Sequence, residues 1–221
     1  MLRQTYSLAA VLTGDFIGSR RNASALQHAM DVLQTVASDL PGDLNCSVIF
    51  DRYRGDGWQI LLTEGRHGLR AALRIIAALQ HANALPTRIA LGFGQAALPP
   101  DNDLGAASGP AFVTAGDVLA AMDRNQRLAI PRIPDPAHAA YKALVLFLDS
   151  ESRNWTRGQA EAMYEALRLQ PQTQEEIASR LGVTRQAIQS RLSGTTLGAV
   201  EEALHAFETR MKDMFDTGQM P

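Results

Sequence analysis

The sequence is poor in several features that would narrow its function. It contains one cysteine, Cys46, which excludes a disulfide framework within the chain and any zinc site built from several cysteines. The formal net charge is -2, so the chain as a whole does not attract nucleic acid or anionic lipid, and any contact with DNA must come from a local basic surface. No apolar run approaches the roughly 18 residues that a membrane span needs.

The amino-terminal segment also lacks the features of a secretion signal. Its apolar stretch is short and is interrupted by Thr13, Gly14 and Asp15, a pattern that predicts a strand and no signal peptide. We therefore expect a cytoplasmic protein without a membrane partner. The histidines show no metal-ligand spacing and are expected at solvated surface positions: His28, His67, His81, His138 and His205.

The first half of the chain alternates between strand and helix periodicity. Strand-like segments lie at 6–12, 46–51, 58–62 and 89–93, and helix-like segments lie at 22–42 and 69–79. The resulting order, strand, helix, strand, strand, helix, strand, is that of the split βαβ, or ferredoxin-like, fold. A third helix around 112–122 and a short edge strand at 128–133 are expected to follow.

Beyond Pro136 the pattern is helical throughout. We predict an α+β protein with two domains. A ferredoxin-like domain covers 1–135, a helical linker covers 136–153, and an all-α helix-turn-helix domain with a C-terminal helix covers 154–221.

The segment 173–192 has the spacing of a helix-turn-helix. Thr173 and Glu176 form a capping-box pattern at the start of the first helix. Gly182 stands where the chain must leave that helix, and Thr184 is placed to cap the second. The alternative interpretation is an ordinary helical hairpin in a regulatory or oligomerisation domain.

The second helix of this pair carries polar side chains on its outward side, and no acidic residue interrupts them. Side chains of this kind read base edges or hold phosphates, so we predict that this side of the helix binds double-stranded DNA. The predicted DNA-binding residues are Thr184, Arg185, Gln186, Gln189, Ser190 and Arg191.

The C-terminal helix carries an apolar seam at alternating steps of three and four residues. Such a seam either forms a dimer or packs within the chain on the helix-turn-helix, and the pattern does not decide between them. We expect a homodimer, because two copies are the usual way for such modules to reach useful affinity. The seam consists of Leu197, Val200, Leu204, Phe207, Met211 and Met214.

Two acidic residues are expected at one edge of the predicted sheet. Asp15 follows the first strand and Asp56 lies in the turn between the second and third. The first and third strands are antiparallel neighbours in this fold, so the two carboxylates converge and repel unless a divalent or other cation balances them. A magnesium ion that carries nucleotide phosphates suits such a pair. The alternative is that both are ordinary turn-forming aspartates.

The residues around these aspartates also favour an anionic ligand. Small glycines would let a ligand approach the backbone, and the arginines before the first helix would clamp phosphate at its N-terminus. The predicted nucleotide-binding residues are Gly14, Ser19, Arg20, Arg21, Gly55 and Gly57, with Gly18 beside them.

Several motifs resemble known families. GDFIGSRR after the first strand, YRGDGWQILL in the hairpin, RIALGFG at 88–94 and SGPAFVTAGDVLAAMDR at 108–124 follow the order of class III nucleotide cyclase catalytic domains. A closer resemblance, over roughly 6–195, is to the SatD-like family of bacterial proteins, through GDFIGSR, GDGWQ and GPAFVTA; these proteins often end in a helix-turn-helix.

The resemblance to the cyclases implies a metal site. It places Asp15, Asp56 and the Phe16 carbonyl around Mg²⁺ or Mn²⁺ with a bound nucleotide. The cyclases also carry an asparagine and an arginine that stabilise the transition state, and these positions hold Thr114 and Val118 here, which argues against efficient cyclisation. Arg124, or an arginine from a second subunit, is a possible substitute.

The predicted function is that of a DNA-binding transcriptional regulator whose cyclase-like domain senses a nucleotide. The alternative is a metal-dependent nucleotide cyclase or nucleotidyltransferase that the helix-turn-helix regulates, so the question of enzymatic activity stays open. A third interpretation makes both domains protein-interaction modules.

Overall fold

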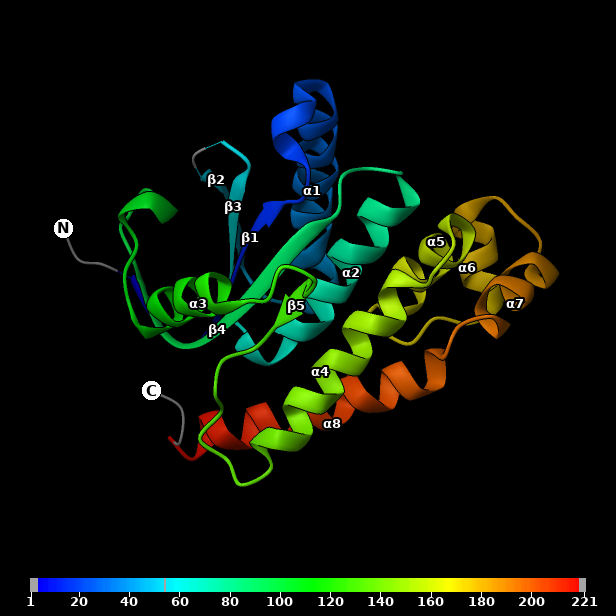
Figure 1. The fold of residues 1–221 in the computed structure, drawn as a ribbon. Helices are drawn as coiled ribbons and strands as arrows, with labels where there is room; N and C mark the ends of the chain where they lie inside the picture. Colours follow the sequence, from blue (N-terminus) through cyan, green and yellow to red (C-terminus); the bar gives the residue numbers. More distant parts are fainter. Residues whose placement is uncertain (1–3, 54, 219–221) are drawn as a thin grey trace.

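The computed structural model describes residues 4–53 and 55–218, which form a mixed α+β structure around a five-stranded sheet (Figure 1). The strands are β1 (Gln4–Phe16), β2 (Val48–Tyr53), β3 (Gly57–Leu62), β4 (Thr87–Leu98) and β5 (Leu128–Ala129). The helices are α1 (Ala23–Leu44), α2 (Gly68–His81), α3 (Pro110–Ala121), α4 (His138–Arg153), α5 (Arg157–Ala166), α6 (Gln174–Leu181), α7 (Arg185–Ser193) and α8 (Leu197–Asp216), with short 3-10 helices η1 (Ser19–Arg21), η2 (Gly65–His67) and η3 (Leu104–Ala106). Within these ranges no helix has an apolar stretch long enough to cross a membrane.

The sheet has the strand order β2-β3-β1-β4-β5. Strand β1 is antiparallel to both β3 and β4, whereas β5 joins the edge of β4 in parallel. The predicted sequence of strands and helices up to β4 is therefore present. Strand β1 extends beyond the predicted 6–12, and its last residues pair Asp15 with Gly57 on one side and with Arg88 on the other.

Alternate residues of β1 serve two separate apolar layers. Leu12 packs in the layer that contains α1 and α2, whereas Val11 packs with α3 on the opposite face. Helix α3 approaches β4 closely at Gly92, where an added Cβ would lie 2.1 Å from the Ala111 carbonyl oxygen. Glycine is required at this position because any side chain would push α3 off the sheet.

The C-terminal helices pack on α2 without a break in the core. One apolar cluster contains residues of β4, α2, α5 and α8, and the rings of Phe93 in β4 and Phe207 in α8 lie 6.0 Å apart. The predicted linker at 136–153 is largely helix α4, which buries Val145 and Leu148 in the same cluster. The helical half is thus joined to the sheet by shared core as well as by the chain.

The seam of α8 is buried within the chain itself. Val200, Leu204, Phe207, Met211 and Met214 are each at most 1% exposed. Of the two alternatives, intramolecular packing is therefore confirmed and dimerisation through this seam is wrong. The helix packs along α4 (Figure 1) and against η2, and not mainly on the helix-turn-helix as the intramolecular alternative expected, because its apolar side chains complete the core over the sheet.

Two buried ion pairs join α2 to its neighbours. Arg74 donates to Asp43 of α1 at 2.6 Å, and its guanidinium lies 4.4 Å from the centre of the Tyr164 ring in α5. Arg70 donates to both carboxylate oxygens of Glu208 in α8, at 2.7 and 2.9 Å. Buried charges of this kind are tolerated only when their partners are in place, so they fix the relative position of the helices.

These ion pairs explain two departures from the sequence-based predictions. Helix α1 does not end at Pro41 but continues to Leu44. The burial of Asp43 and Leu44 stabilises this last turn and offsets the loss of the hydrogen bond that the proline cannot make. His67 was expected at the surface but is 3% exposed, and its Nδ1 lies 3.1 Å from the Glu208 carboxylate.

Candidate functional site

A cleft of about 680 Å³ opens at the edge of the sheet where β1 ends. Strand register brings the two predicted aspartates to it, because Asp15 pairs with Gly57, the residue after Asp56. The Phe16 amide also donates to the Asp56 carbonyl at 3.3 Å. The cleft is lined by Asp15, Phe16, Ile17, Gly18, Ser19, Arg20, Asp56, Arg88 and Arg124.

Arg88 is the immediate partner of Asp15. Its Nε donates to Asp15 Oδ1 at 2.8 Å, and its Nη2 donates to Oδ2. The hydrogen bond to Asp15 raises the pKa of Arg88 above its ordinary value, so the guanidinium stays charged. Both side chains remain about a quarter to a third exposed, at 26% and 31%. A cationic side chain thus balances the carboxylate that was expected to meet a metal ion.

Asp56 is held by a different group. The Ser19 hydroxyl donates to Asp56 Oδ2, and Ser19 is 7% exposed. The chain reaches this position through Gly18, whose φ of 80° is left-handed and favours glycine. The structure thus places Ser19 and Asp56 in direct contact within the cleft, and their predicted nucleotide- and metal-binding roles stay predictions.

Two further arginines line the cleft with exposed side chains. Arg20 belongs to η1, and Arg124 follows α3. With Arg88, they give the cleft three guanidinium groups against two carboxylates, a balance that suits an anionic ligand. Arg21 has its backbone in η1, and its side chain lies outside the part of the chain that the structure describes.

The predicted ligand-binding glycines have other roles. A Cβ on Gly14 would lie 2.2 Å from the Arg88 carbonyl oxygen and 2.5 Å from the Trp58 ring, so this glycine makes room for the buried tryptophan and not for a ligand. Gly55, with a φ of 74°, lies in the β2–β3 connection, and Gly57 is the first residue of β3; neither lines the cleft. The nucleotide-binding roles of Gly14, Gly55 and Gly57 stay predictions, although the space beside Gly14 is already filled by Trp58 and Arg88.

The donor set fits a divalent cation only in part. No group of three or more metal-ligating side chains occurs among the described residues. Magnesium uses one or two carboxylates together with phosphate oxygens, so Asp15, Asp56 and the Phe16 carbonyl have the right chemistry. Both carboxylate oxygens of Asp15 bond Arg88, however, and a two-carboxylate site requires that Arg88 leave.

The second predicted site, the helix pair α6–α7, is built by local interactions. Thr173 Oγ1 accepts from the Glu176 amide at 3.2 Å, and Glu176 accepts from the Thr173 amide at 2.7 Å, which closes a capping box. The hydrogen bonds that the Thr173 amide and hydroxyl donate to the Glu176 carboxylate hold the pKa of Glu176 below its ordinary value. Gly182 ends α6 with a φ of 64°, and the Val183 amide returns to the Ala178 carbonyl at 3.0 Å.

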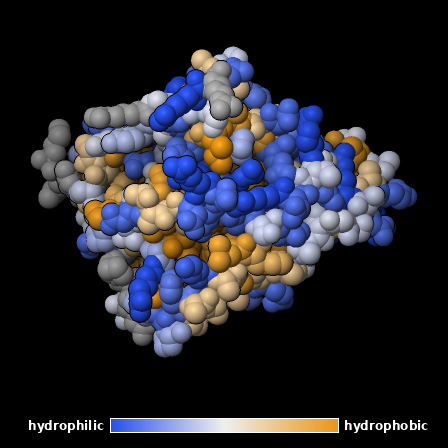
Figure 2. Space-filling view, in the orientation of Figure 1, coloured by the Kyte–Doolittle hydropathy of each residue, from blue (hydrophilic) through white to orange (hydrophobic). Residues whose placement is uncertain are grey.

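Helix α7 turns Ile188 and Leu192 inward, while Arg185, Gln186, Gln189 and Ser190 are exposed. Thr184 caps the helix by accepting from the Ala187 amide at 3.2 Å. The helix lies at the end of the molecule away from the sheet (Figure 1), where the surface is mainly hydrophilic (Figure 2).

Arg191 differs from the other predicted DNA-binding residues. Its Nη1 donates to Glu161 of α5 at 2.5 Å, so this guanidinium is already paired and only part-exposed. The partner lies on the preceding helix, a contact that the spacing within 173–192 could not reveal. The free polar side of α7 is therefore formed by Arg185, Gln186, Gln189 and Ser190.

Sequence reasoning missed Arg88 as a member of the cleft. The predicted fold could have indicated this position, because a ferredoxin-like order places the start of the fourth strand, where Arg88 lies, beside the end of the first. The structure pairs Asp15 with Arg88 in that register.

The chain matches no family model and no curated protein. Its similarity to solved structures is limited to part of the chain. The catalytic core of a rhodopsin-guanylyl cyclase with converted specificity, in complex with ATPαS, is 17% identical with a TM-score of 0.43, over 55% of this chain and 76% of that one. The adenylyl cyclase CyaB from P. aeruginosa is 14% identical with a TM-score of 0.40, over 59% and 79%. An adenylate/guanylate cyclase/hydrolase from Silicibacter pomeroyi is 20% identical with a TM-score of 0.41, over 55% and 73%. Likenesses of this size assign no activity to the chain.

Proposed function

We propose that this chain is a DNA-binding regulator that contacts double-stranded DNA through the outer side of α7. In this proposal, a ferredoxin-like, cyclase-like domain at 1–135 is followed by a helix-turn-helix domain at 154–221. The observation that carries the proposal is that Arg185, Gln186 and Gln189 are exposed together on one short helix, with no acidic side chain among them.

The chemistry of these side chains fits base recognition. A major groove admits one helix, arginine donates bidentately to guanine, and glutamine pairs with adenine. Inward-facing Ile188 and Leu192 fix the helix to its own domain, so its outer side faces away from that domain. Because Arg191 is bound by Glu161, a single copy offers few cationic contacts, and we expect two copies to bind together.

With the α8 seam buried, the exposed apolar side chains of α4, among them Leu146 and Phe147 at 45% each, are the surface we assign to a homodimer (Figure 2).

In the same proposal, the cleft at Asp15 and Asp56 binds the phosphates of a nucleotide, with Mg²⁺ or Mn²⁺, as an effector. Its volume of about 680 Å³ is in the range of small-molecule sites. The three arginines Arg20, Arg88 and Arg124 supply the positive charge that a polyphosphate needs.

Fluorescence anisotropy tests the DNA-binding proposal. Duplexes from the region upstream of the chain's own gene are titrated with the full chain near physiological salt, with a scrambled duplex as competitor. We expect sequence-preferring binding that is lost in Arg185→Ala/Gln189→Ala. Binding that is indifferent both to sequence and to this double variant would contradict the proposal.

A metal-dependent nucleotide cyclase or nucleotidyltransferase is the second candidate. The observation that favours it is the convergence of Asp15 and Asp56 in one cleft. The solved structures that resemble the chain in fold are nucleotide cyclases, but their TM-scores are too low to decide between the two candidates. Thr114 and Val118 supply no charge for a transition state, whereas Arg124 lies in the cleft.

Incubation with nucleoside triphosphates and Mg²⁺ or Mn²⁺ separates the two candidates. A cyclic or condensed product that disappears in Asp56→Ala establishes the enzyme. Absence of product, together with saturable nucleotide binding, leaves the cleft with a sensing role.

A further inference from the structure

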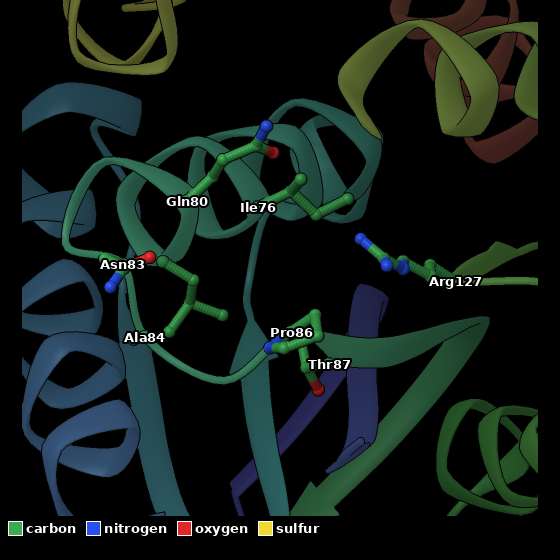
Figure 3. Close-up of a pocket in the computed structure, with 8 residues that line it drawn as sticks. Ile76, Gln80, Asn83, Ala84, Pro86, Thr87 and Arg127 are labelled. Carbon is green, nitrogen blue, oxygen red and sulfur yellow. The ribbon is translucent and has the colours of Figure 1, made fainter. Parts of the chain in front are cut away.

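A second cavity, separate from the cleft, lies where α2 meets the start of β4. It has a volume of about 190 Å³ and is lined by Ile76, Leu79, Gln80, Asn83, Ala84, Pro86, Thr87 and Arg127. Figure 3 shows Arg127 entering from the segment after α3, opposite the end of α2 and the loop that leads to Pro86. None of these residues lines the cleft at Asp15 and Asp56.

One wall of this cavity is apolar. Ile76 and Leu79 of α2 are 7% and 2% exposed, and Ala84 and Pro86 continue the same surface along the loop. The Thr87 hydroxyl adds no free donor, because it donates to the Asp15 and Arg88 carbonyls and accepts from the Trp58 indole. An occupant of this part of the cavity must therefore be apolar.

The opposite wall carries a guanidinium that bonds no carboxylate of the described residues through its side chain. Within residues 4–53 and 55–218, no hydrogen bond or ion pair is formed by the Arg127 guanidinium, which points into the cavity (Figure 3). Asp149, the acid whose charge acts on Arg127, is engaged by Arg153 at 2.9 Å and by the Arg127 backbone amide at 3.1 Å. Burial, followed by the repulsion of Arg153, lowers the pKa of Arg127 against the smaller, opposite effect of Asp149. An anion in the cavity would relieve both effects.

We propose that this cavity binds a small carboxylic acid with an apolar body, whose carboxylate pairs with Arg127 and whose body lies against Ile76, Leu79 and Pro86. A guanidinium matches a carboxylate bidentately. A cavity of about 150 Å³ is known to hold benzene, so a volume of about 190 Å³ suits a single ring or a short branched chain. A phosphate is disfavoured because the single guanidinium balances only one of its two charges.

The cavity also touches the joint between the two halves of the chain. Gln80, which lines it, donates to the Trp155 carbonyl just before α5. A bound acid would therefore lie beside the connection to α5 and the helices that follow. The binding proposal itself does not depend on DNA binding or on the nucleotide cleft.

Isothermal titration calorimetry of the full chain with sodium benzoate tests the proposal, with benzamide as the uncharged counterpart and inorganic phosphate as the anion without an apolar body. We expect one saturable benzoate site and binding of benzamide and phosphate at least about tenfold weaker. Arg127→Gln should weaken benzoate at least about tenfold, whereas Arg132→Gln, an exposed arginine on the same segment, should leave it unchanged.

A steric variant protects the test against a folding failure. Ala84→Phe keeps Arg127 and fills the cavity, so it should abolish benzoate binding while the thermal melt shows a folded chain. Benzoate that does not bind, that binds equally to Arg127→Gln and Ala84→Phe, or that binds less tightly than phosphate would overturn the proposal. Loss of binding in Arg124→Gln with retention in Arg127→Gln would also overturn it, because the site would then be the cleft.

Discussion

Arginine occupies two contrasting settings in this molecule, the interior around α2 and the outer side of α7. Arg70 and Arg74 are buried and each bonds a carboxylate from another helix. Arg185 is exposed, and the described part of the chain gives its guanidinium no carboxylate partner. Charges that the chain itself satisfies hold the helices together, whereas charges that it leaves unsatisfied mark the surfaces available to other molecules.

The cleft at the sheet edge is intermediate between these settings. Asp15 and Arg88 satisfy each other, yet both remain partly exposed and line an open volume. A ligand that enters the cleft must compete with an existing ion pair, while a ligand of α7 meets free side chains. Breaking each kind of contact should therefore have a different measurable consequence.

The largest effect on stability is expected from the interior. Asp43→Ala leaves Arg74 buried without its counterion, so the free energy of unfolding should fall by roughly 3–5 kcal/mol. Asp39→Ala, one turn earlier on α1, removes only an exposed hydrogen bond to Tyr164 and should cost less than about 1 kcal/mol. Urea denaturation followed by circular dichroism measures both; equal losses would remove the distinction between buried and exposed charges.

A smaller effect, on binding alone, is expected at α7. Arg185→Ala/Gln189→Ala should lower the affinity for the preferred duplex at least about tenfold, because each base contact is worth roughly 1–3 kcal/mol. The free energy of unfolding of the variant should stay within about 0.5 kcal/mol of that of the parent, since both side chains are exposed. Lys212→Ala removes an exposed cation at the end of α8 and serves as the control. A similar loss of affinity in Lys212→Ala would mean that the loss depends on net charge and not on base contacts of α7.

Local patterns predicted much of this fold, and long-range contacts account for most of what they missed. Apolar periodicity located α2 and β4, and the capping box and Gly182 located α6 because those signals act within a few residues. The burial of Glu208 and His67 was not visible, since these residue types are usually solvated and their contact joins positions 141 residues apart.

The same limit applies to the two candidate sites. Strand register brought Asp15 and Asp56 to one edge, as the predicted fold required, but did not show that Arg88 holds Asp15. Likewise, the helical period placed Arg191 outward on α7, and only the packing of α5 shows its bond to Glu161. Sequence reasoning brought together the residues of both candidate sites, but it did not show which of their side chains are already paired within the chain.

The interior pairs should also give stability a pH dependence. Burial alone would raise the pKa of Glu208. Hydrogen bonds from Arg70 and His67 outweigh this effect and hold the pKa of Glu208 below its ordinary value. The stabilisation is therefore complete above the unfolded-state pKa and is lost as the pH falls through the lower folded-state value. Urea denaturation at stepwise lower pH should show that the free energy of unfolding falls more steeply in the parent than in Glu208→Gln. The same pH dependence in both proteins would contradict a stabilising role of the Arg70–Glu208 pair.

The smallest effect on stability is expected in the cleft. Arg88→Ala should change the free energy of unfolding by less than about 1 kcal/mol, because the pair with Asp15 is partly exposed. By freeing Asp15, the same substitution should strengthen Mn²⁺ binding, as followed by the electron paramagnetic resonance signal of free Mn²⁺. Asp15→Ala/Arg88→Ala should remove that gain, and a gain that survives the double substitution would place the ion elsewhere.

Chemical-shift mapping tests the central claim most directly, because it reports where on the chain DNA binds. Backbone amides of the isotope-labelled full chain are followed while the upstream duplex is added, and in a separate titration while ATP and Mg²⁺ are added. The account predicts that DNA shifts the amides of 184–190 and that the nucleotide shifts those of 15–20, 56 and 88. DNA-induced shifts confined to the cleft, with α7 unchanged, would contradict it.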